Sequence, residues 1–335
     1  MNGARRNFLM AWLAGSSFQS PAKAQAESGQ LGSLGGPGNP CTRALLVGVG
    51  QVAALPRRLW LRGPANDVLL MRQALQERGV DEADIICLGA AEPAGKPSPA
   101  THLASHARIT AAMHTLLSRT RAGDQVVLHL AGHGVQVPQR PPLKPGTAPE
   151  LDGLDEVFLC ADTQAWDSNN GRLPGGLYDD DMDDWMGALV ARGACVLAIF
   201  DTCHASGLHR DRRGLTRQRG IAAAELGVPS GPSTPPRQAA AAKPQDLQGR
   251  VLAFAARSHE GTPEEWLPKR SPQAQVHGVF TYAVVQALRN GVADAAALRR
   301  SVAGQYLSAG RESPTPSVLG GGALLPGILP RTQAN

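Results

Sequence analysis

The chain has 335 residues, of which 42% are hydrophobic and 18% charged, a composition typical of a globular protein. Its formal net charge of +5 includes three basic residues and no acid in the first 26 positions, so the remainder carries only +2. A nearly neutral body argues against nucleic-acid binding, and no apolar run approaches the roughly 20 residues of a membrane-spanning helix.

The first 26 residues have the pattern of an export signal. Arg5-Arg6 precedes an apolar stretch, and Ala24-Gln25-Ala26 fits a signal-peptidase site. The run that starts at Arg5 also resembles a twin-arginine signal, which would export the protein already folded. A disordered basic tail is the alternative. We expect removal of residues 1–26, a periplasmic or extracellular protein, and a flexible leader at 27–40.

Strands and helices alternate along the rest of the chain. Apolar runs that predict buried strands occupy residues 43–50, 84–88, 124–130, 157–160, 194–200 and 250–256. Helical spacing of apolar residues marks 64–78, 109–119, 181–191, 280–289 and 295–307. Prolines around 314–319 favour an edge strand. The alternation predicts an open, mainly parallel α/β sheet covered on both faces, with its ligand site beyond the carboxyl ends of the strands.

Residues 211–248 interrupt this alternation. They are rich in Pro, Ser and Ala, which predicts a flexible linker between a region at 41–210 and another at 249–330. The five cysteines are an odd number without C-x-x-C spacing, so a structural zinc site is not expected and at least one thiol is free. Cys87 and Cys195 lie in or beside predicted core strands, and we expect both to be buried thiols.

Two predicted strands end in residues that carry chemistry. One ends at Gly132-His133-Gly134 and the other at Asp201-Thr202-Cys203. Because parallel strands end at the same edge of a sheet, His133 and Cys203 are expected to face each other. A cysteine thiolate is a nucleophile, and a nearby histidine activates it or protonates a leaving amine. The amides of Gly134 and Cys203 are candidates for an oxyanion hole.

An ordered set of motifs makes this pattern more specific. The central motifs are AGHG at 131–134, DGLDE at 152–156, YDDDM at 178–182 and DTCH at 201–204. With LLVGVG at 45–50, GPANDV at 63–68 and HGVFTYAVVQAL at 277–288, the set resembles metacaspases and bacterial orthocaspases over residues 43–322. The resemblance implies a caspase-like three-layer sandwich with a six-stranded, mostly parallel sheet. It makes 41–210 the p20-like and 249–330 the p10-like region.

The resemblance also implies a cysteine endopeptidase. By motif position its dyad falls on His133 and Cys203, and the carboxylates that hold a basic P1 side chain fall on Asp67 and Asp201. A pair of carboxylates suits a guanidinium. The expected partners of the protein are therefore protein or peptide substrates with Arg or Lys at P1. We also expect a monomer whose chemistry needs no cofactor.

Some metacaspases are activated by calcium. The carboxylates at the matching positions are Asp155, Asp179, Asp180 and Asp211. Calcium takes six to eight oxygen ligands, so convergent aspartates are suitable. A solvated turn with favourable charge at a helix N-terminus is the alternative for the Asp179–Asp181 run.

Three features depart from the family pattern. Ala131 stands where a Ser usually helps to line the P1 pocket, and one extra residue follows His204. The linker holds basic residues that would each be a candidate self-cleavage site if P1 is basic, namely Arg213, Arg217, Arg219, Arg237 and Lys243.

Three alternatives stay open. A binding or scaffold module would keep the fold without catalysis, although such modules usually lack the His or the Cys. A metal-dependent hydrolase would use Cys203, His204 and His209, whose spacing is not a recognised ligand set. A transpeptidase or ligase would use the same dyad.

Overall fold

The computed structural model describes residues 40–89, 103–139, 153–203, 217–229, 247–257 and 260–321. The predicted export signal at 1–26 and residues 27–39 of the predicted leader lie outside these ranges, so export stays a prediction. Within the described ranges, no helix combines the length and the apolar character that a membrane crossing requires.

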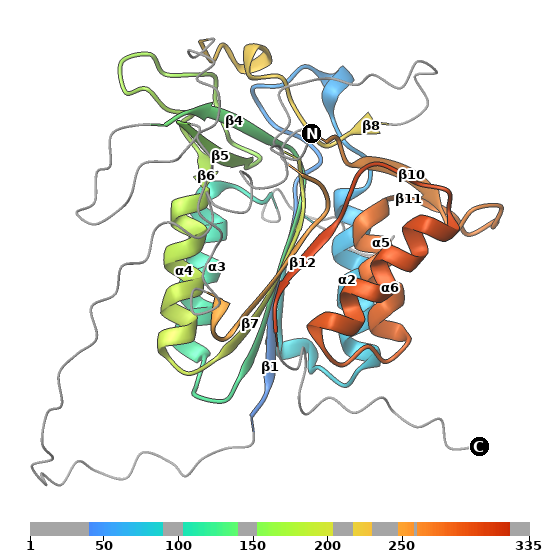
Figure 1. Ribbon diagram of the computed structural model, residues 1–335. Helices are drawn as coiled ribbons and strands as arrows, with labels where there is room; N and C mark the ends of the chain where they lie inside the picture. The colour runs from blue at the N-terminus through green and yellow to red at the C-terminus, as the bar shows by residue number, and fades with distance from the viewer. Residues whose placement is uncertain are drawn as a thin grey trace, which may run out of the picture.

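The centre of the protein is a six-stranded sheet with the strand order β12-β9-β7-β3-β1-β2. In Figure 1 this sheet lies between two groups of helices. Its neighbours run parallel except at one edge, where β12 is antiparallel to β9. The sheet confirms the predicted mostly parallel architecture, and the predicted p10-like region contributes β9 and β12. The strands span Thr42–Gly48 (β1), Ile85–Leu88 (β2), Gln125–Ala131 (β3), Cys195–Asp201 (β7), Arg250–Phe254 (β9) and Ser317–Gly320 (β12).

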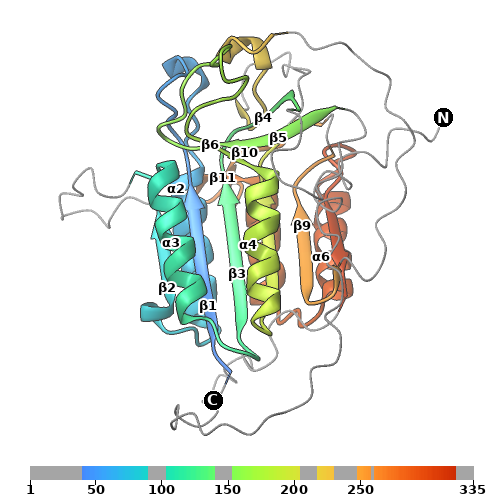
Figure 2. The same ribbon diagram turned by 90° about the vertical axis from the view of Figure 1, so that its left-hand side faces the viewer.

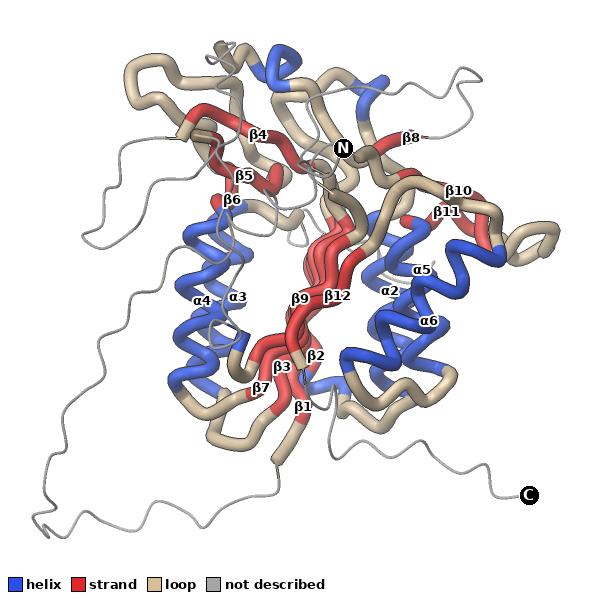
Figure 3. The backbone as a smooth tube through the Cα atoms, viewed as in Figure 1, coloured by secondary structure: helices blue, strands red, loops and turns tan. Residues whose placement is uncertain are grey.

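Helices cover both faces of this sheet (Figures 2 and 3). The helices α3 and α4 pack on one face, while α2, α5 and α6 pack on the other. Since both faces are buried, the central strands are almost continuously apolar, which made them recognisable in the sequence. The helices span Pro64–Glu77 (α2), His106–Arg119 (α3), Asp179–Ala191 (α4), Val279–Arg289 (α5) and Ala295–Ser308 (α6).

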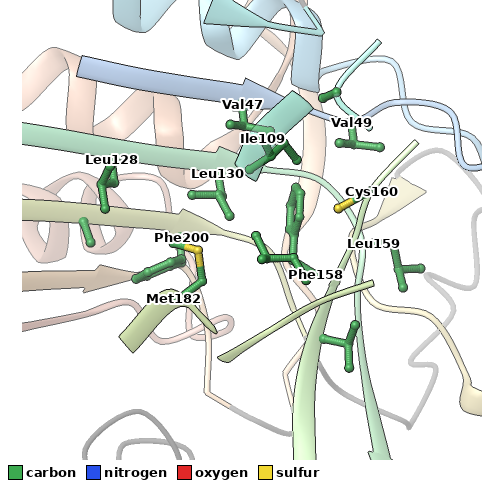
Figure 4. Close-up of a cluster of buried hydrophobic side chains, with 14 of the residues drawn as sticks. Val47, Val49, Ile109, Leu128, Leu130, Phe158, Leu159, Cys160, Met182 and Phe200 are labelled. Atoms are coloured by element: carbon green, nitrogen blue, oxygen red, sulfur yellow. The ribbon is translucent and has the colours of Figure 1, made fainter. Parts of the chain in front are cut away.

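Alternate residues of each strand enter the two halves of the core. In β7, Phe200 packs on the side of α4, whereas Ile199 packs on the side of α5. Figure 4 shows Phe200 beside Met182 of α4 and near Leu130 of β3. This packing fixes the ends of β3 and β7, from which the candidate site is built.

Two smaller antiparallel sheets lie at the carboxyl end of the large sheet (Figure 1). One has the order β4-β5-β6 and the other β11-β10-β8. Their strands span Gly134–Pro138 (β4), Leu154–Leu159 (β5), Gly176–Tyr178 (β6), Arg217–Gln218 (β8), Pro263–Leu267 (β10) and Gln275–Gly278 (β11). Short 3-10 helices span Arg57–Leu59 (η1), Glu82–Asp84 (η2) and Ala223–Leu226 (η4).

Part of the predicted flexible linker is ordered. Residues 217–229 form β8 and η4, and three apolar side chains, Ile221, Leu226 and Val228, join the core on the side of α3 and α4. The composition of the linker predicted flexibility, but these side chains and the pairing of β8 with β10 attach the segment to the body. The arginines at 217 and 219 are therefore held in place.

The cysteines are all free thiols. The prediction that Cys195 is buried is wrong: Cys195 is exposed, because it is the first residue of β7 and lies at the amino end of that strand. Cys87 is only partly buried, while Cys160 and Cys203 are buried.

Candidate active site

The pairing of β3 with β7 brings the two predicted catalytic residues to one edge. Ala131 and Asp201 are register partners in these parallel strands, and the N–H of Gly132 donates to the Asp201 carbonyl at 3.3 Å. His133 and Cys203 each stand two residues beyond that pair, and both side chains are buried. The sheet register therefore places the two residues at the same strand ends, as predicted.

His133 is oriented by a backbone carbonyl. Its Nε2 lies 2.6 Å from the oxygen of Leu59, in η1. A carbonyl only accepts hydrogen bonds, so Nε2 carries the proton and Nδ1 keeps its lone pair. Burial lowers the pKa of His133 to about 4, against smaller opposing effects of the Leu59 carbonyl, Glu264 and the Arg219 carbonyl. At neutral pH the ring is neutral and can accept a proton.

The Cys203 thiol donates a hydrogen bond to the carbonyl oxygen of Glu260. This contact ties the residue to the loop between β9 and β10, and it requires the thiol rather than the thiolate. A nucleophilic Cys203 would have to give up this proton to a base.

The two predicted acidic residues meet in the interior. Asp67, in the first turn of α2, and Asp201, the last residue of β7, are both 0% exposed. Each forms an ion pair with Arg219, whose Nη2 contacts Asp67 and whose Nη1 lies 3.1 Å from Asp201 Oδ2. Arg219 is itself 0% exposed. The predicted P1 pocket therefore holds an arginine of the chain's own linker.

Sequence reasoning missed a third carboxylate. Glu264 of β10 lies with Oε1 3.2 Å from Nη2 of Arg219. The same carboxylate accepts hydrogen bonds from the backbone N–H groups of Gly63 at 2.8 Å and Arg62 at 3.0 Å. It thereby joins β10 to the start of the helix that carries Asp67. No motif in the sequence indicated this role.

Further hydrogen-bond partners hold the two aspartates in position. Asp201 Oδ2 accepts from the Thr281 hydroxyl at 2.6 Å and from the Thr281 N–H at 2.9 Å. Asp67 accepts from the N–H of Gly278 at 3.1 Å, and its Oδ1 lies 3.0 Å from Nδ1 of His277. These donors come from β11 and α5, in the p10-like region, so the pocket needs both predicted regions of the chain.

The electrostatics of the pocket depend on the cation. Burial raises the pKa of Asp67, although Arg219 acts to lower it. Burial alone would lower the pKa of Arg219, but Asp201, Asp67 and Glu264 raise it above its ordinary value. A buried charge that loses its partner is strongly destabilised. The three carboxylates are therefore suited to a pocket that contains a positively charged side chain.

The backbone around Arg219 is hydrogen-bonded on both sides, to β10 and to Gly134. The strand β8 pairs antiparallel with β10, and the N–H of Arg219 donates to Thr262 at 2.9 Å. On the other side, the N–H of Gly134 donates to the Arg219 carbonyl at 3.2 Å, and the N–H of Ile221 donates to the Gly134 carbonyl at 3.2 Å. The predicted oxyanion-hole donor Gly134 thus already contacts a peptide carbonyl.

The structure describes three of the four predicted calcium ligands. Asp155 lies in β5, and Asp179 and Asp180 begin α4, whereas Asp211 lies outside the described residues. Within the described part of the chain, no three or more His, Cys, Asp or Glu side chains gather as a metal site would require. Because Asp211 lies outside the described residues, calcium binding at this set stays a prediction.

One of the departures from the family pattern lies beside the candidate site. Ala131 is buried at the end of β3, directly opposite Asp201. The extra residue after His204 falls within 204–210, outside the described residues.

Known proteins resemble the chain in sequence and fold. A sequence profile described as the metacaspase peptidase C14 domain matches residues 42–210. The chain is 30% identical over 202 residues to Metacaspase-1 of Cryptococcus neoformans var. neoformans, a match that covers 57% of this chain and 39% of that protein. It is 31% identical over 196 residues to Metacaspase-1B of Aspergillus oryzae, covering 56% and 41%. The chain thus matches about two fifths of these relatives' length.

A solved structure supports the fold alone. The crystal structure of a protein from Geobacter sulfurreducens superposes with a TM-score of 0.52 and 18% sequence identity. The match covers 84% of this chain and 93% of that chain.

Proposed function

Because the chain belongs to the metacaspase peptidase C14 family, we propose that it is a cysteine endopeptidase that cuts proteins or peptides after arginine or lysine. One observation supports the P1 preference most strongly. The guanidinium of Arg219 is wholly buried against Asp67 and Asp201, while its carbonyl is bound by Gly134. A P1 residue of a substrate needs these same two contacts, a pocket for its side chain and a donor for its carbonyl.

The proposed reaction begins with the Cys203 proton. His133 takes this proton, and the sulfur attacks the P1 carbonyl carbon to form a C–S bond. The carbonyl oxygen becomes an oxyanion that the N–H groups of Gly134 and Cys203 stabilise. When the C–N bond breaks, His133 returns the proton to the leaving amine, and a thioester remains. Water, deprotonated by His133, then hydrolyses the thioester and restores the thiol.

The chain's own linker is a candidate first substrate. The ion pairs of Arg219 with Asp67 and Asp201 and the hydrogen bond from Gly134 to its carbonyl support the Arg219–Gly220 peptide bond as the one that the dyad would cut. Residues 217–218 pair with β10 on the acyl side, and Ile221 hydrogen bonds to Gly134 on the amine side. Of the basic residues of the linker, Arg219 is therefore the proposed site of self-processing.

Peptide cleavage tests the proposed activity. Matched fluorogenic peptides with Arg, Lys or Asp at P1 would be assayed with the parent protein and with Cys203→Ala. We expect cleavage after Arg and Lys that falls about 1000-fold or more in the variant. Cys195→Ala is the matched control, because Cys195 is an exposed thiol at the opposite end of the same strand. Cleavage only after Asp, or equal activity of Cys203→Ala, would refute the proposal.

A further inference from the structure

The loop between β9 and β10 contacts Cys203 through a backbone oxygen. The Cys203 thiol donates a hydrogen bond to the carbonyl of Glu260, and Cys203 is only 1% exposed. A carbonyl oxygen only accepts hydrogen bonds, so this bond is lost when the sulfur becomes a thiolate. A hydrogen bond that only the neutral form makes favours that form. The position of this one carbonyl therefore affects how easily Cys203 ionises.

The carboxylate of Glu260 holds its residue in place. Oε1 accepts a hydrogen bond from the Thr315 hydroxyl at 2.9 Å, and Oε2 accepts one from the Thr315 N–H at 2.6 Å. Oε2 also accepts from the N–H of Arg257 at 3.1 Å, and the Glu260 N–H donates to the Arg257 carbonyl at 3.0 Å. We call the hydrogen bonds of Glu260 with Thr315 and Arg257 the Glu260 latch.

The central sheet holds both sides of this latch. Thr315 lies two residues before β12, whose Ser317 is the register partner of Phe254, the last residue of β9. The strand β9 in turn pairs parallel with β7, which ends two residues before Cys203. The latch therefore fixes the carbonyl of Glu260 relative to the strand that positions the thiol.

We infer that Glu260 is a positioning residue that restrains the nucleophile: its carboxylate holds Thr315, and its carbonyl keeps the Cys203 thiol protonated. The inference deepens the proposed function, on which it rests, because it concerns the sulfur that would attack a substrate. The latch lies wholly in the p10-like region, so that region acts on Cys203 directly as well as through the pocket for P1. Loosening the latch should make Cys203 more reactive, whereas loss of a mere structural support should not.

Other charged or titratable groups lie at or near the same strand ends. They belong to the dyad and to the buried ion pairs, namely His133, Asp201, Arg219, Asp67 and Glu264. Burial lowers the pKa of His133 to about 4, so its ring is neutral from pH 6 upward. The carboxylates stay paired with the guanidinium. None of these groups is changed in the variants below, so a difference in the ionisation of Cys203 is attributable to the latch.

The pH profile of Cys203 alkylation tests the inference without any peptide cleavage. The protein is treated with iodoacetamide between pH 6 and pH 10, and peptide mass mapping isolates the rate at Cys203 from the other free thiols. Glu260→Gln places an amide donor against the donors of the latch. We expect it to lower the midpoint of the profile by about one pH unit, which raises the rate at pH 7 about tenfold.

Two further variants complete the test. Thr315→Val removes only one donor of the latch and should shift the midpoint in the same direction by less, which also keeps the test open if Glu260→Gln does not fold. Glu312→Gln is the control, because it removes an exposed carboxylate three residues from Thr315 and should leave the profile unchanged.

The profile distinguishes restraint from exposure. A variant that raised only the plateau rate at high pH, with the parent midpoint, would have exposed Cys203 to the reagent and would overturn the inference. An unchanged profile in folded Glu260→Gln and Thr315→Val, or an equal shift in Glu312→Gln, would overturn it as well. Because alkylation needs no turnover, a shifted midpoint would support the latch even in a protein that cleaves no peptide, and an active peptidase with an unshifted midpoint would refute the latch alone.

Discussion

The backbone N–H of Gly134 donates a hydrogen bond to the carbonyl oxygen of Arg219, at 3.2 Å. The guanidinium of the same arginine forms ion pairs with Asp67 and Asp201. Both the carbonyl and the side chain of one residue are therefore held, as the proposed function requires of a P1 residue. A segment bound in this way also covers the site, so self-cleavage and access for other substrates are expected to be linked.

Removing the cation should destabilise the folded protein. Arg219→Ala leaves three buried carboxylates without their partner, and loss of one member of a buried ion pair typically costs about 3–5 kcal/mol. We expect a loss of this order in urea unfolding of Cys203→Ala protein. Arg217→Ala, two residues away on the partly buried strand β8, should cost much less. Similar losses for the two variants would contradict the assignment of Arg219 to the pocket.

Gly278 should be required as a residue without a side chain. A Cβ at this position would collide with Oδ2 of Asp201 and would lie 2.6 Å from the Arg219 guanidinium. We expect Gly278→Ala to cost about 1–3 kcal/mol of stability and to lower kcat/KM for Arg peptides at least tenfold. Gly304→Ala is the control, because its Cβ would meet no atom within 4 Å. Full activity of Gly278→Ala would mean that the pocket lies elsewhere.

The fold and the shared edge of the two strand ends could be predicted because they follow from local pattern and sheet register. The apolar runs that became β3 and β7 end at Ala131 and Asp201, and parallel pairing of those ends places His133 and Cys203 at one edge. Nothing in the pattern specified that these two runs would be adjacent in the sheet, because parallel pairing alone predicts only that both ends lie at the same edge.

The remaining parts of the site depend on tertiary pairing. Glu264 and Glu265 are identical in type and adjacent in sequence, and only the pairing of β10 with β8 and β11 decides which one faces the pocket. Arg219 likewise could not be separated from the other basic linker residues. Its neighbours Ile221 and Leu226 anchor the segment in the core, a role that the composition of the linker obscured.

Two buried histidines should make the protein sensitive to mild acid. Burial lowers the pKa of both His129 and His133 to about 4, from an ordinary value of 6.5. The unfolded chain therefore takes up protons near pH 6.5 and the folded chain only near pH 4, so stability falls as pH drops through this window. Each histidine should account for about 2 kcal/mol between pH 7.5 and pH 5.

Urea unfolding of Cys203→Ala at pH 7.5 and pH 5 measures this loss. His129→Gln removes one of the two groups, so its stability should fall less between the two pH values, whatever its absolute stability. The contribution of Asp67 to the pH dependence of stability has the opposite sign. Its raised pKa lets the folded state take up a proton before the unfolded chain does as the pH falls. An unchanged pH dependence in His129→Gln would contradict a neutral, buried His129.

Calcium activation is a prediction that involves one residue, Asp211, outside the described part of the chain. If Asp155, Asp179, Asp180 and Asp211 bind calcium, a chelator should lower kcat/KM at least tenfold and added calcium should restore it. Asp180→Asn should weaken the calcium response, whereas Asp184→Asn, an exposed carboxylate on the same helix, should leave it intact. Equal activity with chelator and with calcium would show that calcium does not activate the protein.

Intact-mass analysis of the purified full-length chain shows whether Cys203 cuts the chain after Arg219. We expect the parent protein to be cut between Arg219 and Gly220, which yields a fragment that begins at Gly220. The cut should be absent in Cys203→Ala and Arg219→Ala and present in Arg217→Ala. A parent protein that stays intact with calcium present, or the same cut in Cys203→Ala, would contradict a Cys203 peptidase that recognises Arg219 as its P1 residue.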